Sequence, residues 1–123
     1  MITVPGFLLR RLYVKGSLRN SGEGFLFKLK NQMGSGYARK LMPLTVDGEG
    51  VPAKDCFFTA QEERFPFSAV SEETPFTLTL NRTTTIEVVG RTLDKGSHKI
   101  GLAFEVAGLG HLSFDFVDVV QEG

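Results

Sequence analysis

Apolar and polar side chains alternate along much of the chain, as they do in β-strands that bury one face. In residues 24–30, Phe25, Phe27 and Leu29 point to one side of the predicted strand, and Lys28 points to the other. The same period of two recurs in residues 42–46, 76–80, 85–88, 100–106 and 112–116. The pattern therefore predicts a protein built from sheets with one apolar face each.

The last two predicted strands constrain their own register. The apolar side chains of residues 100–106 and 112–116 all lie at even positions. Residues that are directly opposed in an antiparallel pair point to the same face, so the two numbers of each pair must add up to an even number. A three-residue loop, Gly108-Leu109-Gly110, meets this condition and pairs Phe104 with Phe114.

Eight or nine such strands without helices between them predict an all-β fold, an antiparallel β-sandwich of immunoglobulin-like or jelly-roll-like type. Residues 93–100 look like the turn that enters a late strand in many immunoglobulin-like sandwiches. A closed β-barrel is the alternative. A helical turn is expected only at residues 71–73. The chain of 123 residues is long enough for one hydrophobic core and too short for two, so residues 1–123 are expected to form a single domain.

Composition and charge exclude several function classes. Hydrophobic residues make up 41% of the chain and charged residues 23%, which are ordinary values for a globular domain. The net charge of zero gives no electrostatic support to a nucleic-acid role. No apolar run reaches the roughly 18 residues that a membrane span needs. Residues 1–6 lack the pattern of a signal peptide, so we expect a cytoplasmic protein.

The charges are divided unevenly along the chain. Residues 1–54 contain nine Lys or Arg and three Asp or Glu, a balance of +6. Residues 55–123 contain five and eleven, a balance of −6. If the two halves form separate surfaces, the domain is dipolar and suited to self-association or to a charged partner. If strands from both halves interleave, the two charges cancel.

Few residues could bind a metal or a cofactor. The two histidines, His98 and His111, have opposite parity and lie about 30 Å apart along the predicted strand pair, so one chain cannot bring them to one metal ion. A site that two subunits share is the alternative. The single cysteine, Cys56, is followed by Phe57 and Phe58 and is predicted to be a buried structural thiol. We therefore predict neither a cofactor nor a metal in this chain.

His98 and Asp118 are the only candidates for catalysis. In the predicted register Asp118 pairs with Ile100, one step diagonal from His98 on the same face. The sequence has no GxSxG elbow that would bring a serine nucleophile to them. The alternative interpretation is a polar pair that closes one end of the sandwich.

A second candidate is an interaction site in residues 63–70. Phe65 and Phe67 flank Pro66 in an irregular stretch. Large apolar rings on a backbone that proline stiffens are typical anchors of protein interfaces. The alternative is a loop that folds both rings into the core.

Four motifs occur in order along most of the chain. They are Ser17-Leu18-Arg19-Asn20 with Gly24-Phe25-Leu26-Phe27-Lys28-Leu29, Leu44-Thr45-Val46-Asp47-Gly48-Glu49 with Val51-Pro52, Leu93-x-x-Gly96-x-His98-x-Ile100, and Phe114-Asp115-Phe116-Val117-Asp118. Their order and the length of the chain resemble the small β-subunit family of bacterial C-glycoside deglycosidases.

The resemblance implies a non-catalytic accessory (β) subunit of a carbon–carbon lyase that acts on C-glycosides. It also implies a partner, a TIM-barrel α subunit of the sugar-isomerase type, which would hold a divalent metal. The alternatives are a homo-oligomeric structural or binding domain and a small enzyme that works at His98 and Asp118. Short chains of this kind can also carry a hydroxymethylglutaryl-CoA reductase label. We find no support for that label, because a dinucleotide fingerprint is missing and one small sandwich cannot house both substrates.

Overall fold

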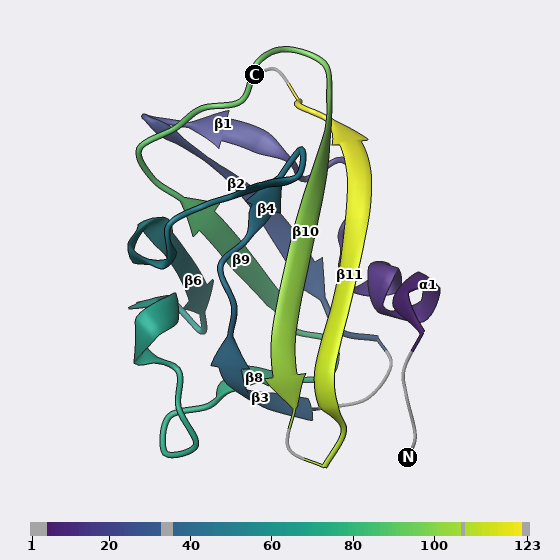
Figure 1. The fold of residues 1–123 in the computed structure, drawn as a ribbon, viewed down its shortest axis with the longest axis vertical. Coiled ribbons are helices and arrows are strands. Elements are labelled where there is room, and N and C mark those ends of the chain that lie inside the picture. The colour runs from purple at the N-terminus through teal and green to yellow at the C-terminus, as the bar shows by residue number, and fades with distance from the viewer. Residues whose placement is uncertain (1–4, 33–35, 107, 122–123) are drawn as a thin grey trace.

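Two antiparallel sheets pack face to face and enclose the hydrophobic core (Figure 1). The structure is a computed structural model that describes residues 5–32, 36–106 and 108–121. Rings from opposite sheets meet between them, since the ring centroids of Phe27 and Phe116 are 5.1 Å apart and those of Phe58 and Phe76 are 4.8 Å apart. The sheets do not close into a barrel, and the predicted all-β sandwich is confirmed.

Each sheet has its own strand order. The first sheet consists, in spatial order, of β1 (Arg19–Ser21), β2 (Gly24–Lys30), β9 (Thr83–Val88), β6 (Cys56–Ala60) and β7 (Glu63–Pro66). The second consists of β5 (Glu49–Gly50), β4 (Thr45–Val46), β10 (Ser97–Val106), β3 (Gly36–Leu41) and β8 (Phe76–Leu78), with β11 (Gly110–Val119) along the other side of β10. The described ranges thus hold eleven strands instead of the eight or nine expected, because bends isolate several strands of only two or three residues.

Short helical segments occur where the alternation predicted none. They are α1 (Gly6–Leu9) and the 3-10 turns η1 (Arg10–Leu12), η2 (Ala53–Asp55) and η3 (Phe67–Ala69). The expectation of a helical turn at residues 71–73 was wrong, because these residues form bends. The α1 helix lies beside β11, where it covers part of the outer edge of the second sheet (Figure 1). None of the helices in the described ranges is long and apolar enough to cross a bilayer.

The hairpin of β10 and β11 keeps the predicted faces but not the predicted partners. Phe104 pairs with Leu112, and Phe114 pairs with Leu102, so the expected pairing of Phe104 with Phe114 was wrong. Val106 pairs with Gly110, and three residues separate them, one position earlier than predicted. The paired numbers add up to 216 instead of the predicted 218. Because both sums are even, the same side chains still point toward the core.

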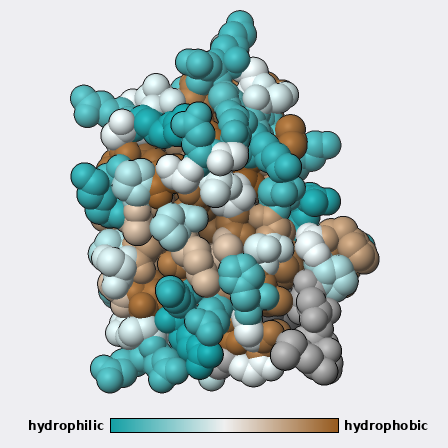
Figure 2. Space-filling model, viewed as in Figure 1, coloured by the Kyte–Doolittle hydropathy of each residue, from teal (hydrophilic) through white to brown (hydrophobic). Residues whose placement is uncertain are grey.

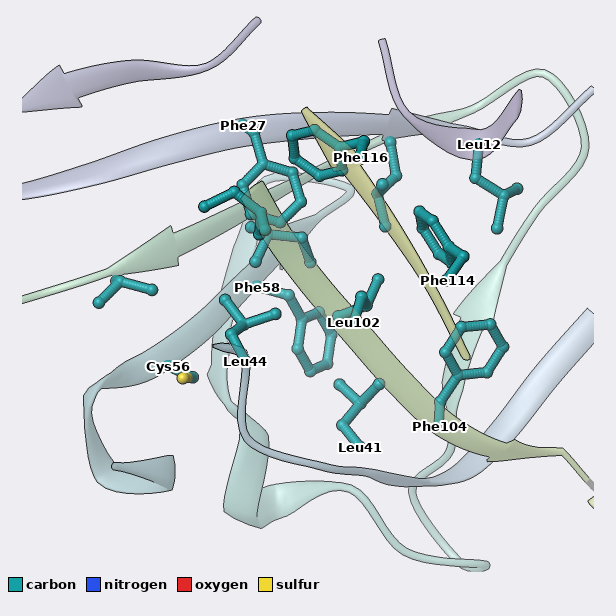
Figure 3. Close-up of a cluster of buried hydrophobic side chains, with 14 of the residues drawn as sticks. Leu12, Phe27, Leu41, Leu44, Cys56, Phe58, Leu102, Phe104, Phe114 and Phe116 are labelled. Atoms are coloured by element: carbon teal, nitrogen blue, oxygen red, sulfur yellow. The ribbon is translucent and has the colours of Figure 1, made fainter. Parts of the chain in front are cut away.

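The core contains most of the side chains that the alternation assigned to it, whereas Met42 and Val106 are half-buried and Leu80 is exposed. Phe25, Phe27 and Leu29 of β2 are completely buried. Figure 3 shows Phe27, Phe116 and Phe114 lying along the strands, with Phe58 and Leu102 nearby. Leu80 was expected on the buried face of its strand but is 44% exposed, because β8 ends at Leu78.

The two oppositely charged halves of the sequence interleave in space. Strands of both halves lie in each sheet, and in the second sheet β3 of the first half lies between β8 and β10 of the second half. Arg10 lies 3.6 Å from Asp115, and Arg39 lies 3.2 Å from Glu72 and 2.9 Å from Glu105, so first-half cations meet second-half carboxylates. Figure 2 shows hydrophilic side chains over much of one face, with hydrophobic atoms visible between them.

Candidate functional site

His98 is held at one end of the sandwich by two acceptors. Its Nδ1 lies 2.7 Å from Oδ2 of Asp47, and its Nε2 lies 2.7 Å from the carbonyl oxygen of Asp94. A carboxylate and a carbonyl oxygen both accept only, so this geometry suits a ring that carries a proton on each nitrogen. The Asp47 carboxylate also accepts a bond from the backbone N–H of Lys99, at 2.9 Å. These contacts link the turn after β4 to the loop that enters β10.

The contacts shift the pKa values of His98 and Asp47 in the directions that keep both side chains charged. The hydrogen bond to Asp47, followed by the one to the Asp94 carbonyl, raises the pKa of His98. The bond from the Lys99 backbone, followed by the one from His98, lowers the pKa of Asp47. The His98 side chain is 13% exposed, whereas that of Asp47 is 48% exposed and therefore strongly screened by solvent.

The pair predicts a pH dependence of stability. Because the pKa of His98 is raised in the folded state, its contribution is fully present below its unfolded pKa of about 6.5 and is lost as the pH rises through the folded value. We expect the urea midpoint of the wild type to fall over that interval, and this fall to be absent in His98→Asn. His111→Asn, which changes an exposed histidine on β11, is the matched control. An equal fall in wild type and His98→Asn would contradict the assignment.

Asp118 lies opposite His98 in the β10–β11 pair but has other hydrogen-bond partners. Its Oδ2 accepts from the phenol of Tyr13 at 2.6 Å and from the backbone N–H of Gly16 at 2.8 Å, and its Oδ1 accepts from the N–H of Val119. Burial opposes ionisation of this carboxyl, but the three hydrogen bonds outweigh it and lower the pKa of Asp118. The predicted diagonal through Ile100 was wrong, since Ile100 pairs with Phe116.

Tyr13 connects the Asp118 carboxylate to the aromatic side chains of the core. Its ring stacks on Phe116 with centroids 3.6 Å apart, and burial together with the bond to Asp118 raises the pKa of Tyr13 to about 12. The phenol oxygen also accepts from the N–H of Leu18, at 3.2 Å. The two catalytic candidates, His98 and Asp118, therefore each hold a separate part of the chain in place.

The three predicted interface anchors, Phe65, Pro66 and Phe67, are partly or completely buried. Phe67 is 2% exposed, and the rings of Phe65 and Phe67 both pack on Phe58, at 5.3 and 6.4 Å between centroids. Phe65 and Pro66 are half-buried. The structure thus places Phe67 in the core and leaves Phe65 and Pro66 partly accessible.

A cleft of about 530 Å³ opens beside this segment, between β6–β7 of the first sheet and β8 of the second. Phe58 and Phe65 contribute aromatic surface, Thr84 contributes a hydroxyl, and Arg82 and Glu63 contribute charges of opposite sign. Sequence reasoning missed the cleft. The available signal was parity, because Thr84 shares even positions with Ile86 and Val88 and so belongs to the inward face.

Three exposed hydrophobic side chains belong to α1 and to β11, which lie in contact. Phe7 of α1 is 65% exposed, and Val117 and Val119 of β11 are 64% and 48% exposed. We call these three residues the α1–β11 flank. Asp115 lies beside them, 3.6 Å from Arg10 and 3.7 Å from Lys99. Charges of both signs therefore adjoin the apolar flank.

Groups that could bind a metal or act as a nucleophile are sparse. Within residues 5–32, 36–106 and 108–121, no three His, Cys, Asp or Glu side chains come together as metal ligands would. Cys56 is completely buried, and its Sγ lies 3.6 Å from the carbonyl oxygen of Pro52. Burial raises the pKa of this thiol, which disfavours the reactive thiolate.

The comparison with protein families corrects the resemblance inferred from the motifs. A family model described as "Hydroxymethylglutaryl-CoA reductase, N-terminal domain" matches residues 8–121. The likeness to the C-glycoside deglycosidase β subunit was therefore wrong, and so was the assignment as an accessory subunit of a lyase. The four motifs misled because they describe turns and alternating strands that many sandwiches share. None of the curated proteins compared matches the chain.

The rejection of the hydroxymethylglutaryl-CoA reductase label was also wrong. That argument asked for a dinucleotide fingerprint and for room to hold both substrates, which are requirements of a catalytic domain. The matching model describes an N-terminal domain instead, and it extends over nearly the whole chain. The chain belongs to the hydroxymethylglutaryl-CoA reductase N-terminal domain family.

Proposed function

We propose that this chain is a binding domain of its family and that it associates with a second copy of itself through the α1–β11 flank. The observation that carries the proposal is the position of the exposed apolar side chains. Five large hydrophobic side chains are exposed among the described residues, and three of them belong to this flank. Exposed apolar groups that cluster next to polar ones mark interaction sites.

Charge favours a second copy as the partner. A contact related by a two-fold axis brings the same surface patch together with itself, so the patch must complement its own charges. Asp115 carries one sign and Lys99 and Arg10 carry the other within this patch, so cations of one copy can meet the carboxylate of the next. The net charge of zero leaves no overall repulsion between copies.

The residues that sequence offered for catalysis are engaged in holding the fold. Both ring nitrogens of His98 have acceptors, and the Asp118 carboxylate receives three hydrogen bonds. This arrangement supports a binding role better than a catalytic one. A cytoplasmic location fits the proposal, since the one cysteine is unpaired and buried.

The test is the oligomeric state as a function of concentration. We expect the full chain to dimerise in sedimentation-velocity experiments, and Val117→Lys to raise the dissociation constant about tenfold or more, because a charge replaces an apolar contact. Leu80→Lys, which changes an exposed leucine outside the flank, is the matched control and should leave the constant unchanged. A monomer at high micromolar concentration, or equal effects of the two variants, would contradict the proposal.

A further inference from the structure

The cleft between β6–β7 and β8 contains one deeply placed polar group without a hydrogen-bond partner. Thr84 lies on the inward face of β9, where it pairs with Leu29, and it is 3% exposed. Within the described residues its hydroxyl makes no hydrogen bond, and no fully buried side-chain oxygen is left unsatisfied. The hydroxyl is therefore reached from the cleft and can both donate to and accept from a ligand there.

Apolar side chains line much of the cleft, together with the more accessible threonines Thr74, Thr77, Thr79 and Thr83. Phe58 is 6% exposed and stacks on Phe65, with ring centroids 5.3 Å apart, and both rings line the cleft. Ala60 and Val70 add aliphatic surface. A volume of about 530 Å³ lies within the usual range for small-molecule sites, which are mostly apolar with a few placed polar groups.

The charges of the cleft lie at its rim and balance each other. Arg82 and Glu63 are both exposed, and they carry opposite signs. Neither side chain forms an ion pair or a side-chain hydrogen bond within the described residues. A ligand with a net charge gains no consistent attraction from this lining, whereas an uncharged ring meets the aromatic surface.

We propose that the cleft binds an uncharged ring compound with a hydroxyl group, whose ring packs on Phe58 and Phe65 and whose hydroxyl bonds to Thr84. This site is separate from the α1–β11 flank. It does not depend on self-association, so either proposal can fail without the other.

The experiment uses the full chain, labelled with ¹⁵N, and three probes: phenol, benzene and benzoate. We expect phenol to produce saturable shifts of the amide signals of Phe58, Phe65 and Thr84. Thr84→Val keeps the shape and removes the hydroxyl, so it should weaken phenol binding about fivefold to tenfold and leave benzene binding within about twofold. Thr84→Ser should bind phenol like the wild type.

Thr85→Val is the matched control, because Thr85 neighbours Thr84 on the opposite face of β9. It should change the binding of none of the probes. The proposal fails if phenol shifts do not saturate or map elsewhere, or if Thr84→Val weakens phenol and benzene equally. It also fails if benzoate binds more tightly than phenol and loses that advantage in Arg82→Gln, since the site would then select an anion.

Discussion

Phe27→Ala is expected to lower the free energy of unfolding by about 3–5 kcal/mol. The side chain is completely buried between the sheets, with its ring centroid 5.1 Å from that of Phe116 and 6.1 Å from that of Tyr13. Truncation removes apolar contacts and leaves a cavity that two paired sheets cannot easily collapse, because their spacing is fixed by many other side chains. Urea unfolding followed by circular dichroism measures the loss.

Lys28→Ala is the control for this loss, since Lys28 is exposed on the other face of β2. It should change the free energy of unfolding by no more than about 0.5 kcal/mol. The double variant Phe27→Ala/Phe116→Ala should cost less than the two single variants together, because the rings share contacts. Comparable losses from Phe27→Ala and Lys28→Ala would mean that β2 presents its other face to the core.

Alternation predicted the buried faces well because burial itself has a period of two in a strand. Phe25, Phe27 and Leu29 of β2 and Ile86 and Val88 of β9 are all completely buried, as their positions indicated. The same reasoning does not reach beyond the end of a strand. Leu80 keeps the parity of Phe76 and Leu78, but the backbone has already left β8.

The register of a strand pair was harder to predict from the sequence than the face that each strand buries. Parity requires only that paired numbers add up to an even number, so a shift of two residues satisfies it equally well. Glycine did not resolve the choice, because Gly108 and Gly110 both adopt positive φ, at 84° and 83°. The actual register pairs Phe104 with Leu112 and Phe114 with Leu102, so these two large rings are not directly opposed.

The candidate site shows the same limit at longer range. The sequence placed His98 near Asp118, and the two are opposed, but the ring binds Asp47, 51 residues away along the chain. That contact depends on β4 lying beside β10, and alternation carries no information on which strands become neighbours. Thr84 was missed for a simpler reason, since Thr83, Thr84 and Thr85 are identical in type and differ only in the face they occupy.

Gly24→Ala is expected to destabilise the fold by about 3 kcal/mol, near the upper end of what overpacking usually costs. A Cβ built on Gly24 would lie 1.9 Å from the carbonyl oxygen of Val88 and 2.9 Å from its carbonyl carbon. These are backbone atoms of β9, the central partner of β2, so a side-chain rotation cannot relieve the clash. The strands must separate locally, which weakens the pairing of Phe25 with Val88.

Gly36→Ala is the matched control, because Gly36 is also the first residue of a strand but has no atom of the described residues within 4 Å of an added Cβ and no positive φ. This substitution should leave stability unchanged or raise it slightly, since alanine restricts the unfolded chain more than glycine does. Thermal unfolding of both variants beside the wild type measures the difference. If Gly24→Ala unfolded together with Gly36→Ala, β2 and β9 would have room between them at Gly24, and the close approach that joins the first sheet there would not exist in solution.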